Sequence, residues 1–151
     1  MYPRTHILFG LLMALLIKLI FLVSLMQALI IFASAFLIDI DHYLYYVFKK
    51  KDLSPFRAYA WFIELDKRME KLSAAKRKQY KTPLMIFHGI EFWLILLILS
   101  FYSRIFTFIL IGVAVHMILD YVDIYRERAP FYAKFSQIYT CIKNKNKKEI
   151  K

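Results

Sequence analysis

Two long apolar blocks, separated by a strongly polar stretch, set the pattern of the chain. The first block covers 7–38 with Lys18 as its only charge, which is too long for one membrane-spanning helix and fits two helices of about sixteen residues joined near 21–24. The second block covers 84–124 and is interrupted by polar residues at 102–104. This pattern predicts two helical hairpins, with membrane spans at about 7–21, 25–46, 84–101 and 105–124.

The stretch between the hairpins, 49–81, and the C-terminal segment are polar and basic. In the stretch, Ser54 and Pro55 are typical of the N-cap and first residue of a helix, and apolar and aromatic residues follow them before most of the lysines and arginines. We expect an amphipathic helix here, either lying on the membrane surface or packing against the bundle. The tail, 130–151, is expected to be solvated and frayed. The chain is therefore predicted to be one four-helix domain over 1–129 with a basic tail.

The composition excludes an ordinary soluble domain and a β-rich fold. Apolar residues make up 60% of the 151 residues and aromatic residues 18%, with only 3 glycines and 4 prolines. No segment alternates apolar and polar residues as membrane strands do, so the backbone polar groups have to be satisfied within helices. The expected fold class is all-α, an integral membrane four-helix bundle. The single Cys141 excludes a disulfide framework and a cysteine-based zinc site.

The charge distribution predicts the orientation and the partners. The chain carries 22 Lys and Arg against 11 Asp and Glu, a net charge of +11, and all these cations except Lys18 and Arg104 lie near the N-terminus, in 49–81 or after residue 125. By the positive-inside rule, both termini and the 49–81 loop are cytoplasmic, in a multi-pass protein of the inner (cytoplasmic) membrane. The same cations would attract anionic lipid headgroups. No nucleic-acid partner is expected, because no recognition motif accompanies the charge.

Acidic and histidine side chains lie where membrane helices ordinarily have none. All four histidines belong to this set, and residues three or four apart share a helix face, so the set forms stripes that pair an imidazole with a carboxylate. Turn arithmetic places His88 and His116 at a similar depth, because they lie 15 residues before and 13 residues after Ser103. The members of the set are His6, Asp39, Asp41, His42, His88, Glu91, His116, Asp120 and Asp123.

Burying so many carboxylates is costly, and divalent cations would offset the cost. An Asp at a helix centre costs roughly 2.5–3.5 kcal/mol on insertion scales, and the helices offer almost no Lys or Arg at this level. Divalent ions would neutralise the acids and use the imidazoles as ligands at once. Asp39 and Asp41 are about 200° apart on a helix, so we expect a local break near Ile40. The predicted metal ligands are His6, Asp39, Asp41, His42, His88, Glu91, His116 and Asp120.

Two members of this set are also candidates for catalysis. Glu91 is expected to take or deliver a proton as a general base or acid, with the alternative that it only orients His88. Asp41 is the second expected catalytic residue, in addition to its role as a ligand.

These residues, in this order, resemble the YdjM-like family of membrane-bound metal-dependent hydrolases. The chain departs from the family where Ile38 replaces a proline, where Gly89 stands in place of a serine, and where Lys81-Thr82 is the nearest match to an upstream arginine. The resemblance implies phosphoester hydrolysis, since the family is distantly similar to zinc-dependent phospholipase C and single-strand nucleases. The elements that carry it are Thr5-His6, Asp39-Ile40-Asp41-His42, His88 and His116-x-x-x-Asp120.

The leading hypothesis is a hydrolase with one or two divalent ions, zinc or manganese, acting on phospholipid or a lipid-linked phosphate at the cytoplasmic interface. Two other classes stay open: transport of metal ions or protons, and a non-enzymatic membrane scaffold with a structural metal site. Transport would need polar groups that continue toward the far face. The polar groups on that side, besides Lys18 and Arg104, are Ser24, Gln27, Ser100 and Thr107.

Overall fold

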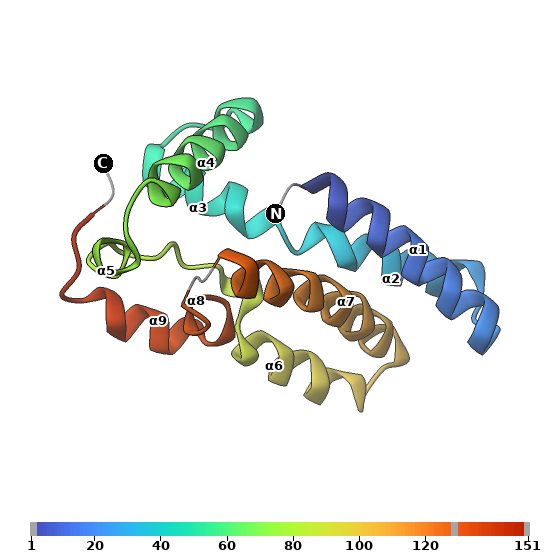
Figure 1. The fold of residues 1–151 in the computed structure, drawn as a ribbon. Coiled ribbons are helices and arrows are strands. Elements are labelled where there is room, and N and C mark those ends of the chain that lie inside the picture. Colours follow the sequence, from blue (N-terminus) through green and yellow to red (C-terminus); the bar gives the residue numbers. More distant parts are fainter. Residues whose placement is uncertain (1–2, 128–129, 150–151) are drawn as a thin grey trace.

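The chain folds into helices joined by short connections (Figure 1). The computed structural model describes residues 3–127 and 130–149. Within these residues the one β-type pairing is an isolated parallel bridge between Tyr80 and Lys148, so the expected all-α class is confirmed. The helices are α1 (Pro3–Phe21), α2 (Leu25–Leu37), α3 (Ile40–Lys50), α4 (Pro55–Glu70), α5 (Ala74–Arg77), α6 (Ile90–Ser100), α7 (Arg104–Glu127), α8 (Tyr132–Phe135) and α9 (Gln137–Asn144), with a 3-10 turn η1 at Ile86–His88.

Four apolar helices, α1, α2, α6 and α7, pack against one another. The turn between α1 and α2 occupies 22–24, where Leu22 has a positive φ of 51°. Ser24 Oγ accepts a hydrogen bond from the Gln27 backbone N–H (3.2 Å) and Gln27 Oε1 accepts one from the Ser24 N–H (2.8 Å), a capping box that starts α2. The turn between α6 and α7 occupies 101–103. Both turns lie where the sequence predicted them.

Small residues allow α2 to be approached closely from two sides. A Cβ atom at Gly112 of α7 would overlap Ser34 Oγ and the carbonyl oxygen of Ile31 on α2, so only glycine fits there. A Cβ atom at Gly10 of α1 would lie 3.0 Å from Ala35 Cβ. Helices pack in this way where small residues let the backbones approach. As a result, α1 and α7 both lie against the C-terminal part of α2.

Two of the described helices are long and apolar enough to cross a membrane: Leu25–Lys50, which joins α2 and α3, and Arg104–Arg126. The apolar helices Thr5–Phe21 and α6 are shorter, so the four predicted spans are supported in part. The predicted span 84–101 is too long, because residues before Ile90 form η1 and extended backbone. The remaining 11 residues of α6 measure about 17 Å, half the thickness of a bilayer core.

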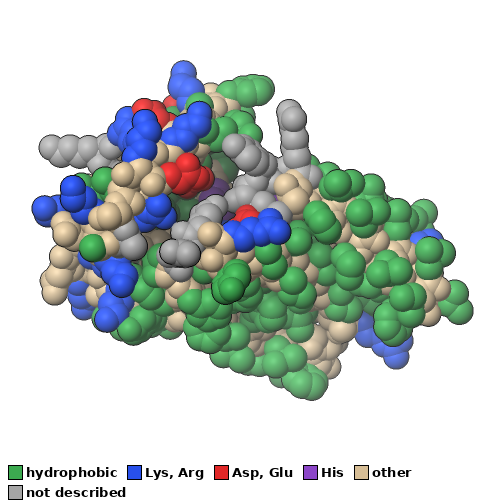
Figure 2. Space-filling model, in the orientation of Figure 1, with side chains coloured by type: hydrophobic (Ala, Val, Ile, Leu, Met, Phe, Trp, Pro, Cys, Tyr) green, Lys and Arg blue, Asp and Glu red, His purple; other side chains and the backbone are tan. Residues whose placement is uncertain are grey.

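The two halves of the molecule have different surfaces (Figure 2). Hydrophobic side chains cover the bundle formed by α1, α2, α6 and α7, whereas Lys and Arg gather over the half that contains α4, α5 and α9. On the bundle, large apolar residues such as Leu19 and Ile98 are 74% and 57% exposed. Histidine side chains are visible at the junction between the halves.

The amphipathic helix expected in 49–81 is α4, and its aromatic face packs against α3. The rings of Trp61 and Tyr46 lie 5.9 Å apart, and those of Phe62 and His42 5.3 Å apart. This face therefore packs on α3, next to the four-helix bundle, and a position of α4 on the membrane surface stays a prediction.

The tail is folded within its described residues, and the prediction of a frayed segment is wrong there. Phe131 stacks on Tyr121 of α7 with ring centroids 5.0 Å apart. The side-chain amide of Asn144 binds both the backbone N–H and the carbonyl oxygen of Thr82, at 2.9 and 2.8 Å. The basic residues after position 142 dominate the sequence pattern of the tail, so the apolar residues of α8 and α9 did not lead to a prediction of helices there. The tail thus lies across the end of the bundle where the acids and histidines gather.

Candidate metal centre

A break between α2 and α3 brings Asp39 and Asp41 into one pocket. α2 ends at Leu37 and α3 begins at Ile40, so the break expected near Ile40 is confirmed. In the connection, the Asp41 N–H donates to the Ile38 carbonyl (3.4 Å) and the His42 N–H to the Asp39 carbonyl (3.1 Å), bonds three residues apart. In a regular helix the side chains of Asp39 and Asp41 would point to different sides. This local tightening turns both of them toward α7 and η1.

Two buried histidines, His88 and His116, each form a hydrogen bond through Nδ1 that fixes the orientation of the ring. His116 Nδ1 lies 2.8 Å from the Ala35 carbonyl oxygen, which can only accept, so Nδ1 carries the proton. His88 Nδ1 lies 2.9 Å from Asp41 Oδ2, which likewise accepts. Neither imidazole is exposed to solvent. In their neutral forms, both rings therefore present the lone pair of Nε2, the atom that binds metal ions.

The two Nε2 atoms meet, and carboxylate oxygens surround them. They lie 3.1 Å apart, and Asp120 Oδ2 lies 3.3 Å from His88 Nε2 and 3.2 Å from His116 Nε2. Asp39 Oδ1 lies 3.5 Å from each nitrogen. Ligand atoms about 2.0–2.1 Å from a tetrahedral zinc ion are separated by roughly 3.3 Å. The triangle of His88, His116 and Asp120 therefore has the dimensions of one face of such a site, and these residues could hold a metal ion.

His88, His116, Asp39 and Asp120 form a cluster, and His6 and His42 also belong to it. His6 on α1 is buried, its ring stacks on His116 at 4.0 Å, and its Nε2 lies 3.5 Å from Asp120 Oδ1. Among the described residues, His6 Nδ1 has no hydrogen-bond partner. His42 is partly exposed, and its Nδ1 lies 3.0 Å from Asp41 Oδ1 and 3.4 Å from Asp39 Oδ1. Each histidine belongs to a further group of donors that could hold an ion, together with Asp39.

Asp41 supports the cluster through His88 and His42. Its Oδ2 accepts hydrogen bonds from His88 Nδ1 and from the Phe87 backbone N–H (3.0 Å), while its Oδ1 faces His42 Nδ1. A carboxylate behind a histidine fixes the tautomer and raises the basicity of the free nitrogen. The predicted ligand Asp41 is therefore better placed to orient His88 than to bind an ion.

Glu91 lies apart from the cluster, and its predicted roles there find no geometric support. Its carboxylate accepts hydrogen bonds from Ser136 Oγ (2.6 Å) and from the backbone N–H groups of Gln137 and Ile138 (3.1 Å each). These are the unpaired donors at the start of α9, where a negative charge is favourable. The i, i+3 spacing to His88 is misleading because Gly89, with ψ of 154°, separates η1 from α6. Asp123 also belongs to none of the metal-compatible groups found among the described residues.

Lys134 is the member of the site that the sequence did not reveal. This residue of α8 reaches the cluster, with Nζ 2.6 Å from Asp120 Oδ2. Asp120 is 1% exposed, so the contact is a short ion pair to a buried carboxylate. The membrane helices were expected to offer almost no Lys or Arg at this level, and the cation found here comes from the tail instead. The aromatic spacing of the tail, with Phe131 and Phe135 one turn apart, was the available signal that this segment folds back.

Three basic residues near the site, Lys49, Arg57 and Lys81, contact acids outside the cluster. Arg57 Nε and Nη2 each lie 2.6 Å from Asp52, and its hydrogen bonds, followed by those of Tyr46 and the Ser54 N–H, hold the pKa of Asp52 well below its usual range. Hydrogen bonds from Lys49 and Lys81 lower the pKa of Glu149 to about 2.

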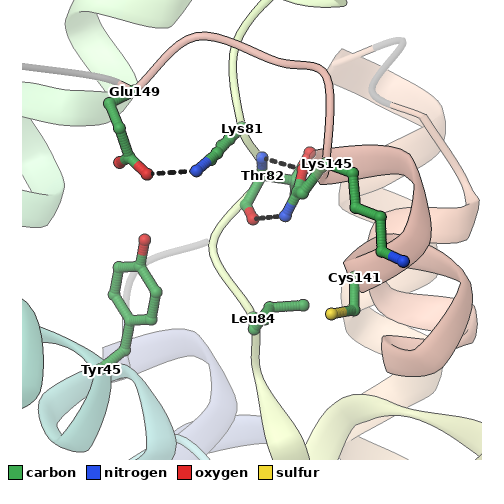
Figure 3. Close-up of a pocket in the computed structure, with 8 residues that line it drawn as sticks. Tyr45, Lys81, Thr82, Leu84, Cys141, Lys145 and Glu149 are labelled. Atoms are coloured by element: carbon green, nitrogen blue, oxygen red, sulfur yellow. Dashed lines mark hydrogen bonds and ion pairs between the residues drawn. The ribbon is translucent and has the colours of Figure 1, made fainter.

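A hollow of about 320 Å³ lies between α3, the segment before η1 and α9 (Figure 3). Two contacts described above lie in its wall: Lys81 with Glu149, and Thr82 with Asn144. It shares no residue with the histidine cluster. Its lining residues are Tyr45, Lys81, Thr82, Leu84, Cys141, Asn144, Lys145 and Glu149.

Comparison of the chain with protein-family models, with curated proteins and with solved structures gave no match.

Proposed function

We propose that the protein is a membrane-bound hydrolase that depends on a divalent metal ion and cleaves phosphoesters at the cytoplasmic surface of the membrane. The observation that carries the proposal is the meeting of two oriented imidazole nitrogens, 3.1 Å apart, with a buried carboxylate oxygen 3.2–3.3 Å from both.

The electrostatics of this arrangement favour a cation at its centre. Two nitrogen lone pairs and carboxylate oxygens point at one another, and lone pairs that face each other without a proton or an ion repel. Among the described groups, Lys134 offsets part of the charge of Asp120 but contacts neither histidine within ion-pair or hydrogen-bond distance. Unpaired buried charge costs several kcal/mol. A divalent ion would use the donors of His88, His116 and Asp120 and neutralise the nearby acids together.

The donor set narrows the choice of metal. Imidazole nitrogens suit zinc, and mixed imidazole and carboxylate sets also accept manganese. We assign His88, His116 and Asp120 as the ligands, with Asp39 and His6 able to add one donor each. Such an ion would supply Lewis-acid activation of water and of a phosphoryl oxygen.

The remaining residues have roles that follow from their exposure. Asp39 and His42 are the members of the cluster with partly exposed side chains, 26% and 28%, so they are the groups that a bound substrate can reach. We assign proton transfer to this pair in place of Glu91. Asp41 holds His88 from behind.

The surface of the molecule supports a lipid as the source of the phosphate. The cluster lies at the junction between the apolar bundle and the basic half (Figure 2). If the bundle is embedded in a bilayer, this junction lies at the level of the lipid headgroups. Phospholipid or a lipid-linked phosphate is therefore the substrate class to test first.

The test is metal analysis and hydrolysis with the whole protein in lipid nanodiscs. We expect about one or two zinc or manganese ions per chain, with most of the metal and the activity lost in His116→Ala and Asp120→Asn. Asp52→Asn is the matched control, because this acid contacts Arg57 and no residue of the cluster. Absence of stoichiometric metal, with hydrolysis that resists a chelator, would overturn the proposal.

The same variants separate the other two classes. Metal flux in proteoliposomes that is lost in His116→Ala, without hydrolysis of any phosphoester, would indicate transport. Bound metal whose loss only lowers the melting temperature, again without hydrolysis, would indicate a scaffold with a structural site.

A further inference from the structure

The Lys134 ammonium contacts a carboxylate oxygen that a bound metal ion would also need. Its ammonium lies 2.6 Å from Asp120 Oδ2, and that oxygen also forms the triangle with His88 Nε2 and His116 Nε2. An ion within bonding distance of Asp120 Oδ2 would have this positive charge as a close neighbour and would repel it. The ammonium and the ion therefore compete for the same carboxylate.

The local structure lets Lys134 change partner without unfolding the tail. The contact with Asp120 is made by the end of a long, flexible side chain and not by the backbone of the tail. α8 is one short turn, and the Lys134 side chain is 23% exposed at the mouth of the site. The rest of the tail is held separately, by the Glu91 carboxylate at the start of α9 and by Asn144 on Thr82. Lys134 can thus swing toward solvent while α9 stays docked.

Lys134 is also the cation best placed to meet an anion at the cluster. Lys49, Lys81 and Arg57 contact Glu149 or Asp52, so much of their charge is already offset. A lysine released beside a metal ion is a typical ligand of a phosphate oxygen, since ammonium and metal then bind oxygens of the same group.

We propose that Lys134 exchanges partners: it pairs with Asp120 when the cluster holds no ion, and it binds a phosphate oxygen of the substrate when the cluster holds a divalent ion. This assignment rests on the proposed function, because it needs a metal at Asp120. Lys134 is then a substrate-binding residue that also lowers the affinity of the cluster for the metal ion.

The first test measures zinc affinity and the affinity of the zinc-loaded protein for inorganic phosphate, in nanodiscs, by calorimetry. In Lys134→Met, zinc should bind several-fold more tightly, because the competitor is gone, and phosphate at least tenfold more weakly. Lys134→Arg should keep phosphate binding within a few-fold of the wild type. Lys145→Met, which removes one tail charge away from the cluster, should change neither affinity.

A second measurement needs no variant. Acetylation of Lys134 in the wild-type protein, followed by mass spectrometry, should become faster when zinc is added and slower again with zinc and phosphate. Weaker zinc binding or unchanged phosphate binding in Lys134→Met, or Lys134 acetylation that zinc does not accelerate, overturns the exchange while His116-dependent metal binding stands. A wild-type protein that binds neither zinc nor manganese overturns the proposed function and the exchange together.

Discussion

Replacing Asp41 by asparagine should weaken metal binding although Asp41 is not assigned as a ligand. Its Oδ2 accepts hydrogen bonds from His88 Nδ1 (2.9 Å) and from the Phe87 N–H (3.0 Å), and its Oδ1 lies 3.0 Å from His42 Nδ1. An asparagine can place its side-chain carbonyl oxygen where Oδ2 lies, facing His88 Nδ1 and the Phe87 N–H, and its NH₂ group toward His42. The geometry then survives, and only the negative charge behind His88 is lost.

The size of the effect follows from what that charge does. Outer carboxylates that support a ligating histidine are worth 10–100-fold in metal affinity, or about 1.4–2.7 kcal/mol. Asp41→Asn should therefore bind zinc at the lower end of this range, about tenfold more weakly, with little loss of fold. Asp41→Ala leaves His88 Nδ1 and the Phe87 N–H buried without an acceptor, which costs about 1–3 kcal/mol of stability for each group.

Competition with a chromogenic chelator measures the zinc affinity of the protein in nanodiscs. Thermal unfolding in the same nanodiscs measures its stability. Asp52→Asn is the control for loss of one acid near the same helix, and it should leave the zinc affinity unchanged. If Asp41→Asn binds zinc as tightly as the wild type, Asp41 does not support His88. If it loses as much affinity as His116→Ala, Asp41 is itself a ligand.

Three further variants test the surroundings of the site. Gly112→Ala should lower stability by about 1–3 kcal/mol in thermal unfolding, because its Cβ overlaps α2, and a stability equal to that of the wild type would refute this packing. Glu91→Gln should speed amide hydrogen exchange in α9, where it removes a charge worth about 0.5–2 kcal/mol at the helix start, and leave zinc affinity unchanged; zinc loss as severe as in His116→Ala would restore Glu91 as a ligand. Because hydrogen bonds from Lys49 and Lys81 lower the folded-state pKa of Glu149 from 4.5 to about 2, the stability that these contacts contribute should be fully present above pH 4.5 and be lost as the pH falls to about 2. Glu149→Gln should remove this pH dependence from hydrogen exchange at 145–149, and a wild-type profile in that variant would contradict the assignment.

The sequence was sufficient for the features that depend on spacing along one helix or on counting from a turn. The first turn follows from the length of an apolar block and the second from its interruption, and the meeting of His88 with His116 follows from their similar distances to the second turn. The break before Asp41 follows from the 200° between two acids that both needed a polar environment. These are local or nearly local constraints, so a pattern can express them.

Contacts made by the tail could not be derived in the same way. Lys134 reaches Asp120 only because α8 folds back onto α7, and nothing in a basic segment tells a solvated lysine from one that docks. Glu91 was misplaced for a related reason: besides the Ser136 hydroxyl, its partners are backbone N–H groups 46 and 47 residues later, which carry no side-chain signature. Long-range pairing through backbone groups leaves almost no trace in composition.

The break between α2 and α3 links two parts of the site that look separate in the sequence. In a continuous helix the Asp39 N–H would donate to the Ala35 carbonyl, four residues earlier. Here it donates to the Phe36 carbonyl instead (3.3 Å), and the Ala35 carbonyl accepts a hydrogen bond from His116 Nδ1–H. The same backbone change therefore turns the carboxylates of α3 toward the cluster and provides the acceptor that fixes His116. Because Gly112 lets α7 approach this carbonyl, the break and the glycine are both needed for His116 to present its Nε2 to His88.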